Sequence, residues 1–317
     1  MSDFSTAGRR AVGIDFGGTS VKVGVFPDML ADGGAEPLIL TTAEHRTVDS
    51  LISGMAEAVH KLRQRFDNIT AVGCGVPGLV EFDSGHVNHV TNVDGWSDVP
   101  LRDILGAKTS LPVIVDNDAN CMAYAEYRHG AASGYRNVVA LTLGTGIGGG
   151  LIIDGGLYRG SRFAAGEIGQ MSIDYQGKIG PYGQLGCLEA YMGNRQIGEL
   201  AAARLHHHDE PEGGWTPKDV AELASAGDPD AADIWIEIAD WLGSGLANIA
   251  WLLNPDAFVI GGGVAKAADL LFGPLERKVR GMVSEVVSDG LRILPAKFGN
   301  DAGMIGSAAQ ALDACSE

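Results

Sequence analysis

The sequence LTLGTGIGGG at residues 141–150 continues an apolar run that begins at Val138, and glycine then occupies positions 144, 146, 148, 149 and 150. Glycine permits positive φ and lets backbone N–H groups approach a ligand, and the hydroxyl of Thr145 adds a further donor. The pattern predicts a strand and a hairpin that holds phosphate. The alternative is a tight glycine-rich turn without a ligand.

A second loop of the same construction lies near the start of the chain. DFGGTSVK at residues 15–22 also follows a short apolar run, and it leads into valines that alternate at positions 21, 23 and 25. One such loop near the start and one near the middle of the chain predict two related halves that face a single nucleotide.

The bulk composition limits the class of protein. The chain of 317 residues is long enough for two lobes, and 45% hydrophobic with 20% charged residues is typical of a globular α/β protein. A net charge of −17 argues against general binding to nucleic acid or anionic membranes and favours a small-molecule partner. Four dispersed cysteines, a polar start and no run of membrane-span length predict a cytoplasmic protein with reduced thiols.

Strand and helix patterns alternate along the chain, which predicts a mainly parallel or mixed α/β sheet with sites at strand ends. The region 81–100 has no regular pattern, and Asp301 is placed to cap a terminal helix. Strands are predicted at 10–26 (a hairpin), 69–76, 113–115 and 257–260, and helices at 51–66, 121–127, 233–253 and 302–311.

Asp118 is the first candidate for chemistry, because it follows a strand, stands beside Asn117 and precedes a helix. A carboxylate in that place can accept a proton from a substrate hydroxyl. The alternative is that Asp118 or Asn117 simply caps the helix.

Four further features allow two interpretations each. Asp15, where the first strand meets its glycine loop, suits hydrated Mg²⁺ beside phosphates, or it forms an Asx turn. The glycines at 261–263 either border a nucleoside or make a strand-to-helix turn. Glu167 and Glu189 are acceptors for sugar hydroxyls, or they are solvated surface acids. The histidines at 206–208 resemble an adventitious metal patch, or they form a solvated loop.

Taken in order, these motifs resemble those of the ROK family of sugar kinases within the actin-like ATPase superfamily, over almost the full chain. The matching segments are DxGGT at 15–19, VPG at 76–78, Asn92 with GW at 95–96, NDAN at 117–120, LGTGIGGG at 143–150, GEIG at 166–169, GCLE at 186–189 and IGGG at 260–263.

The resemblance implies a two-lobed α/β fold of the actin-like ATPase, or ribonuclease H-like, type. The small lobe would comprise residues 1–118, completed by a helix at 301–317, and the large lobe residues 119–300. Asp118 would be the general base, and Asp15 would hold Mg²⁺ through water. The sugar would contact Gly78, Asn92, Asn117, Glu167, Gln170 and Glu189. The nucleotide would contact Gly17, Gly18, Thr19, Lys22, Gly144, Thr145, Gly146 and Gly148 at its phosphates, and Gly262 and Gly263 at its adenosine.

One departure concerns the structural zinc that many members of this family carry. The family's zinc histidine and two of its cysteines are replaced here by Gln170, Gly180 and Tyr182, which leaves only Cys187. One thiolate cannot make a tetrahedral zinc site. We therefore expect no structural zinc, with packing by Tyr175, Pro181 and Tyr182 steadying the loop. Because the family histidine also contacts the sugar, Gln170 leaves the preferred sugar open.

The resemblance implies an ATP-dependent hexokinase, with glucose as the leading substrate and a homodimer as the assembly. Fructose, mannose, allose, an N-acetylhexosamine such as N-acetylglucosamine, and polyphosphate as donor stay open. Two other classes of protein are alternatives. A sugar-responsive repressor needs a DNA-binding segment, for which the ten residues before the first strand leave no room. A sugar sensor without activity would have no need of Asp15, Asp118 and Glu167.

Overall fold

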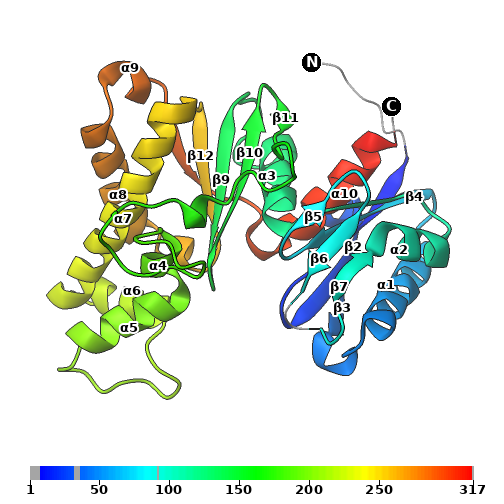
Figure 1. Ribbon diagram of the computed structural model, residues 1–317, viewed down its shortest axis with the longest axis horizontal. Helices are drawn as coiled ribbons and strands as arrows, with labels where there is room; N and C mark the ends of the chain where they lie inside the picture. The colour runs from blue at the N-terminus through cyan, green and yellow to red at the C-terminus, as the bar shows by residue number, and fades with distance from the viewer. Residues whose placement is uncertain (1–7, 32–35, 91–92, 316–317) are drawn as a thin grey trace. The chain divides into compact units, whose positions relative to one another are not determined.

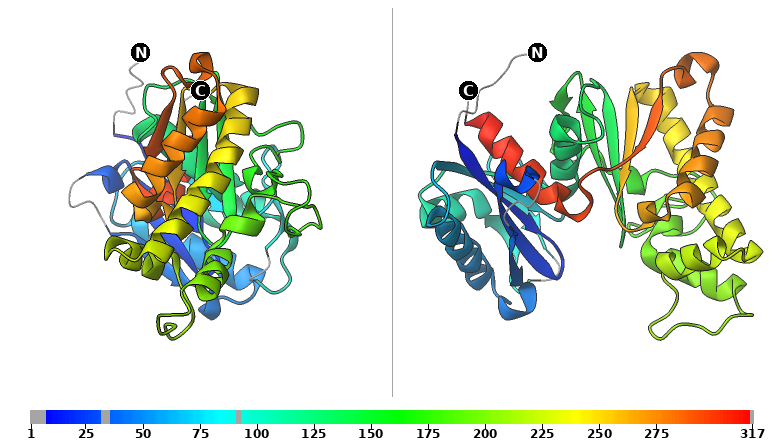
Figure 2. Two further views of the ribbon diagram at one scale, coloured as in Figure 1. Left: turned by 90° about the vertical axis from the view of Figure 1, so that its left-hand side faces the viewer. Right: turned by 180° about the vertical axis from the view of Figure 1, so that it is seen from behind.

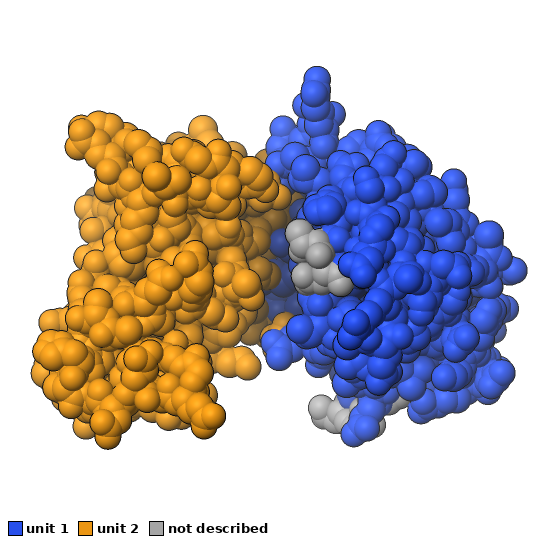
Figure 3. Space-filling view, turned by 60° about the horizontal axis from the view of Figure 1, so that its bottom comes forward, with its two compact units in different colours: residues 1–133, 157–165, 300–317 blue, residues 134–156, 166–299 orange. Residues whose placement is uncertain are grey.

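The computed structural model describes residues 8–31, 36–90 and 93–315, and the chain divides into two compact units (Figure 1, Figure 3). Unit 1 comprises Met1–Ser133, Leu157–Ala165 and Asn300–Glu317, and unit 2 comprises Gly134–Gly156 and Gly166–Gly299. The predicted lobe boundary at Asp118 differs from this division. Helix α3 (Asp118–His129) belongs to unit 1 because it packs closely against α10 (Ala302–Ala314).

Unit 1 is built on a five-stranded mixed sheet in the order β3-β2-β1-β4-β8. β1 and β2 form the predicted hairpin, and β4 and β8 run parallel to β1. The strands are β1 (Arg10–Phe16), β2 (Ser20–Phe26), β3 (Leu38–Thr41), β4 (Ile69–Val76) and β8 (Val113–Asn117), and the other helices are α1 (Val48–Arg63), α2 (Leu101–Thr109), η1 (Asp28–Leu30), η2 (Thr42–Glu44) and η5 (Gly299–Asp301).

Different elements cover the two faces of this sheet. Successive residues of β1 point to opposite faces, so they show what each face contacts. Val12 and Ile14 are fully buried in the core that α1 shares. On the other face, a Cβ atom at Gly13 would collide with the carbonyl oxygen of Met304, and one at Gly73 with that of Ser307. Glycine in β1 and β4 therefore lets α10 lie directly on the strand backbones (Figure 2).

The region that was predicted to be irregular, residues 81–100, instead contains most of a small antiparallel sheet. Its strands are β5 (Val80–Glu81), β6 (His86–His89) and β7 (Ser97–Pro100), in that order. Val87 and Val99 pair across it and are buried. Strands of two to four residues are too short to show a periodic pattern in sequence, which explains the error.

Unit 2 repeats the sheet topology of unit 1. Its order is β11-β10-β9-β12-β13, with an antiparallel β9–β10 hairpin and with β12 and β13 parallel to β9. The prediction of two related halves is therefore confirmed at the level of topology. The strands are β9 (Val138–Leu143), β10 (Ile147–Ile153), β11 (Gly156–Leu157), β12 (Ala257–Gly261) and β13 (Arg292–Pro295), and the helices are η3 (Ile168–Gln170), α4 (Glu189–Met192), α5 (Asn194–Arg204), α6 (Pro217–Ser225), α7 (Pro229–Leu253), η4 (Val264–Ala267), α8 (Asp269–Met282) and α9 (Glu285–Ser288).

Two helix ends refine the sequence-based predictions. α7 begins four residues before the predicted start at position 233, because Asp228 caps it through Ala231 N and Pro229 fits its first position. Asp301 precedes α10 as predicted, but its side chain makes no capping hydrogen bond. None of the helices in the described ranges combines the length and the apolar character that crossing a membrane requires.

Candidate active site

The carboxyl end of β8 places Asp118 at the first position of α3. Asn117 is the helix cap, since its Oδ1 accepts hydrogen bonds from Ala119 N (2.9 Å) and Asn120 N (3.2 Å). Oδ1 of Asp118 accepts from Ala119 N at 2.9 Å, and the residue is half-buried. Capping is therefore the task of Asn117, and a carboxylate on the first turn gains from the positive end of the helix dipole.

Gly78 lies beside this strand end. Its carbonyl oxygen accepts a hydrogen bond from Nδ2 of Asn117 at 3.0 Å, and its φ of +85° is one that glycine adopts freely. The structure thus brings together three of the predicted site residues, Gly78, Asn117 and Asp118. Asn92, the fourth candidate in this region, lies outside the described residues.

Asp15 and Lys22 are partners across the β1–β2 hairpin. Burial raises the pKa of the Asp15 carboxyl to about 6, and the nearby Lys22 charge opposes that rise while Asp301 adds to it. Gly303 stands next to the Asp15 carboxylate, where a Cβ atom would come within 2.7 Å of Oδ1. Lys22 Nζ donates to the Asn300 carbonyl oxygen at 2.7 Å. The Asp15 carboxylate and the Lys22 amine are thus both held next to the turn of the hairpin.

The turn of this hairpin is short and exposes its backbone. Gly17 N donates to the carbonyl oxygen of Ser20 at 2.9 Å, and Gly18 and Thr19 between them are exposed. Thr42, which follows β3, is hydrogen-bonded to the turn, because its backbone N–H donates to the Thr19 carbonyl oxygen at 3.1 Å. The turn is therefore held by backbone hydrogen bonds, and its two tip residues stay exposed.

The corresponding hairpin of unit 2 turns at Gly144–Thr145–Gly146. Gly144 N donates to the carbonyl oxygen of Gly146 at 3.0 Å, and Asn194 N donates to that of Gly144 at 2.9 Å. Gly148 follows on β10, opposite Thr142. Gly261 of β12 also pairs with Thr142, so the segment Gly262–Gly263 leaves the sheet at the same edge as the hairpin turn. Gly262 needs its φ of +88° and its missing side chain, because it passes against the backbone of Leu143.

Glu189 connects this hairpin to the predicted sugar-binding segment. Its Oε2 accepts a hydrogen bond from Ile147 N at 2.8 Å, and its Oε1 accepts one from Nε2 of Gln170 at 3.2 Å. Glu167, which precedes η3, is an exposed residue, yet partial desolvation and the Glu189 carboxylate raise its pKa. Three predicted residues, Glu167, Gln170 and Glu189, therefore form one polar group in unit 2.

The loop that contains Gly180 and Tyr182 is closed by side-chain amides. Gln184 Nε2 donates to Gln170 Oε1 at 2.6 Å, and Gln184 Oε1 accepts from Tyr182 N at 3.0 Å. Gly180 packs against the buried Cys187. The expected aromatic packing is wrong, because the side chains of Tyr175 and Tyr182 are 79% and 83% exposed and Pro181 is exposed as well.

A pocket of about 710 Å³ opens beside Gly263 in unit 2. Its volume falls in the range of small-molecule sites. Apolar and aliphatic surface dominates the lining, with a few polar side chains around it. The lining includes Asn194, Thr216, Glu222, Trp235, Gly263 and Lys266.

The sequence predicts Gly262 and Gly263 beside an adenosine, but it does not predict the other residues that line this pocket. Thr216 and Lys218 come from the start of α6, where Thr216 forms a capping box with Asp219. The pattern T-P-x-D is a recognisable helix start, but it gives no sign that the helix lines a pocket. Asn194 likewise becomes recognisable as a pocket residue only through the hydrogen bond from its backbone N–H to the Gly144 carbonyl oxygen.

Comparison with known proteins agrees with this architecture. The family model described as the ROK family matches residues 11–314. The glucokinase of Halalkalibacterium halodurans is 37% identical, covering 94% of this chain and 93% of the relative. The glucokinase of Streptomyces coelicolor is 35% identical, with coverage of 94% and 96%.

A solved structure extends the likeness to three dimensions. The ROK family glucokinase from Streptomyces griseus, in complex with glucose and AMPPNP, superposes with a TM-score of 0.78 at 33% identity, covering 96% of this chain and 99% of that one. The predicted α/β fold class is thereby confirmed. With a family model that spans nearly all of its length, the chain belongs to the ROK family.

Proposed function

We propose that the chain transfers the γ-phosphoryl group of ATP to a hexose, with glucose as the leading acceptor and glucose 6-phosphate as the product. Its likeness to proteins named glucokinase over nearly its full length supports the activity. The structural observation that carries the proposal is the position of Asp118, which begins α3 directly after Asn117, the residue that caps this helix.

In the proposed reaction, the Asp118 carboxylate accepts the proton of the sugar 6-hydroxyl. The hydroxyl oxygen forms a bond to the γ-phosphorus, and ADP leaves with the bridging oxygen. Such transfers depend mostly on positioning and on neutralising phosphate charge. Asn117 fixes the base, because its two hydrogen bonds to the α3 backbone and its bond to Gly78 hold the strand end in one conformation.

The sugar ring would be held by polar side chains and exposed backbone groups. In unit 2, the Glu189 carboxylate is already oriented by Ile147 N and Gln170, which leaves its remaining lone pairs for hydroxyls. The proposed set comprises Gly78, Asn92, Asn117, Glu167, Gln170 and Glu189.

The nucleotide would use backbone donors at its phosphates and the pocket beside Gly263 at its base. The proposed phosphate contacts are Gly17, Gly18, Thr19 and Lys22, together with Gly144, Thr145, Gly146 and Gly148, and the adenosine contacts are Gly262 and Gly263. A largely apolar pocket with few polar groups suits a purine. A polyphosphate chain has no apolar part to bury, so this pocket favours ATP as donor.

Asp15 fits a role toward Mg²⁺. Its carboxylate stands at the hairpin end, next to the space that Gly303 leaves open and within the field of Lys22. Mg²⁺ often keeps most of its waters and uses one or two carboxylates. Bound there through water, it would neutralise charge on the β- and γ-phosphates.

The test is a coupled ADP-release assay with Mg-ATP and a panel of glucose, fructose, mannose, allose and N-acetylglucosamine. Asp118→Asn is the test variant. Asp103→Asn, an exposed acid in the first turn of α2, is the matched control. We expect turnover with glucose, unchanged in Asp103→Asn and lowered by roughly 10²-fold or more in Asp118→Asn, as loss of a general base predicts.

Other outcomes separate the alternatives. Faster turnover with another hexose than with glucose would make that hexose the preferred substrate and leave the proposed mechanism unchanged. Turnover with polyphosphate alone overturns ATP as donor. Sugar binding with no ADP release from any hexose points to a sensor and sinks the kinase proposal. The homodimer and the cytoplasmic location stay predictions, to be checked by light scattering and by fractionation of cells.

A further inference from the structure

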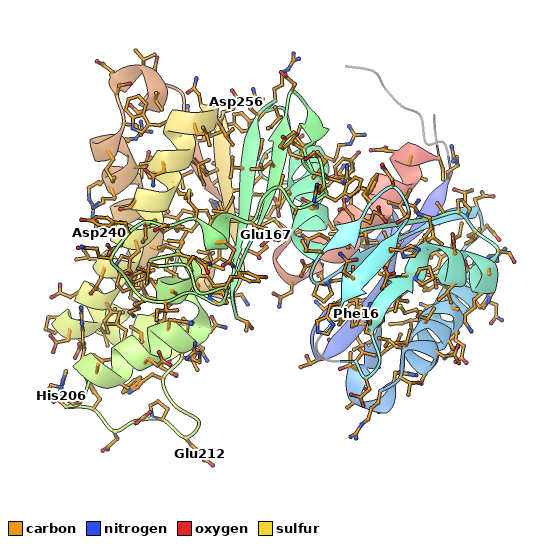
Figure 4. The ribbon with its side chains drawn as sticks, viewed as in Figure 1. Phe16, Glu167, His206, Glu212, Asp240 and Asp256 are labelled. Carbon is orange, nitrogen blue, oxygen red and sulfur yellow. The ribbon has the colours of Figure 1, made fainter. Side chains whose placement is uncertain are left out.

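The loop between α5 and α6 brings two consecutive histidines to the helix cap of α7. Figure 4 shows this loop with His206 and Glu212 labelled. Nε2 of His208 lies 2.8 Å from Oδ2 of Asp228, and Nε2 of His207 lies 3.2 Å from the same oxygen. One ligand atom from each of the three residues lies within 4.8 Å of the others.

We propose that His207, His208 and Asp228 form a binding site for one transition-metal ion of the Zn²⁺ type. Two imidazoles and a carboxylate are ligands that such ions favour over Mg²⁺ or Ca²⁺. At ordinary Zn²⁺ bond lengths, two ligand atoms of a tetrahedral site lie about 3.3 Å apart. The observed separations of 2.8 and 3.2 Å need only small side-chain movements to reach that value.

The carboxylate is held in place before any ion arrives. Oδ1 of Asp228 accepts a hydrogen bond from Ala231 N at 2.8 Å, which caps the longest helix of the described chain and leaves Oδ2 directed at the histidines. Only 13% of the Asp228 side chain is exposed, compared with 42% for His207 and 33% for His208. The site therefore has one rigid ligand, two ligands from a loop and an open side for water.

A second carboxylate stands behind one of the ligands. Oδ2 of Asp230 lies 3.8 Å from Nδ1 of His207. A metal on Nε2 requires the ring proton on Nδ1, and an acceptor on that side favours this tautomer. Both acids also lower the electrostatic cost of a divalent cation. Shortening this separation to a hydrogen bond would give the carboxylate–histidine–metal order that is common in protein metal centres.

The binding site would also act on the pocket described above. The ligands at positions 208 and 228 bracket α6, whose first turn supplies Thr216 and Lys218 to the pocket wall. An ion held by both ends would restrain the segment between them. We expect slower backbone hydrogen exchange over residues 209–227 in the Zn²⁺ form.

Equilibrium dialysis of the chelator-treated chain against Zn²⁺, without an affinity tag, tests the site. We expect one Zn²⁺ per chain. His208→Gln and Asp228→Asn should weaken binding by roughly tenfold or more, and asparagine still caps α7. His206→Gln is the matched control, because His206 belongs to the same histidine run but not to the cluster. Co²⁺ supplies a second readout through a visible ligand-field band that His208→Gln abolishes.

Two results would overturn the proposal. One is equal loss of Zn²⁺ in His206→Gln and His208→Gln, which means a mobile histidine run. The other is weak binding that does not saturate near one ion per chain. Far-ultraviolet circular dichroism of each variant confirms that it has folded. The kinase assay is independent of this test, since the cluster contains none of the residues proposed for phosphoryl transfer.

Discussion

The guanidinium of Arg159 donates two hydrogen bonds to Oδ2 of Asp116, at 2.7 and 3.1 Å, two residues before Asp118. Asp116 is only 2% exposed, and its Oδ1 accepts from Asn117 N and from Nδ2 of Asn120. Arg159 comes from the short segment that returns to unit 1 between two stretches of unit 2. That segment is thus bound to the strand end that carries the proposed base.

Removing Arg159 should leave the Asp116 charge buried without its cation. We expect Arg159→Met to lower the free energy of unfolding by roughly 3 kcal/mol in denaturant titrations. Arg136→Met is the control, because Arg136 and its partner Asp154 are both more than 70% exposed, and it should cost less than about 1 kcal/mol. Adding Asp116→Asn to Arg159→Met should restore part of the loss. Equal costs for Arg159→Met and Arg136→Met would contradict this account.

Asp15 should reduce stability at neutral pH. Its pKa in the folded chain is about 6, against 3.8 for the free side chain, so folding opposes its ionisation. This cost is absent below pH 4, grows as the pH rises toward 6 and is then constant. In Mg²⁺-free buffer, Asp15→Asn should therefore stabilise the chain by at most about 3 kcal/mol at pH 7 and by nothing at pH 3.5. A stabilisation that did not depend on pH would argue against desolvation as its cause.

The side chain of Asn117 has two roles, since its oxygen caps α3 and its amide nitrogen donates to Gly78 O, and one substitution can test them separately. Asn117→Asp keeps an oxygen for Ala119 N and Asn120 N, so the unfolding free energy should change by less than about 1 kcal/mol. The new carboxylate cannot donate to Gly78 O, and its charge raises the pKa of Asp118. We expect the acidic limb of the kcat/KM profile to move to higher pH. An unshifted profile would mean that the two groups do not interact.

The hydrogen-bonded amide pair of Gln170 and Gln184 should matter for the sugar. Gln184→Ala removes the hydrogen bond that holds Gln170, which in turn contacts Glu189. We expect a sugar KM several-fold higher with kcat nearly unchanged, consistent with about 1 kcal/mol for one hydrogen bond. Tyr182→Ala, in the same loop but with an 83% exposed side chain, should leave the KM as it is. A rise in both variants would assign the effect to the loop as a whole.

Features that depend on neighbouring residues could be predicted from the sequence. The hairpins around residues 17–19 and 144–146 follow from glycine after alternating apolar residues, and the strand at 69–76 was predicted to the residue. The helix at 233–253 was recognised from its apolar stripe. In each case the deciding interactions lie within one element or one turn.

Contacts between distant segments left no comparable signal. Arg159 and Asp116 are 43 positions apart, and nothing local marks either as half of a buried pair. The wall of the pocket joins α6 to residues after Gly263, which no periodic pattern connects. The prediction that aromatic rings pack in the loop around Tyr182 is wrong for a related reason. The loop is closed by a hydrogen bond between two glutamine amides that lie 14 positions apart in sequence.

The bare backbone that Gly13 and Gly73 present to α10 also bears on how the chain emerges from a ribosome. β1 and β4 belong to the first eighty residues, yet the helix that covers them follows all of unit 2 in sequence. A nascent chain therefore holds the complete sequence of unit 2 before unit 1 can close. The unit whose synthesis begins first is therefore also the one whose synthesis ends last, and a chain truncated before residue 300 leaves that sheet uncovered.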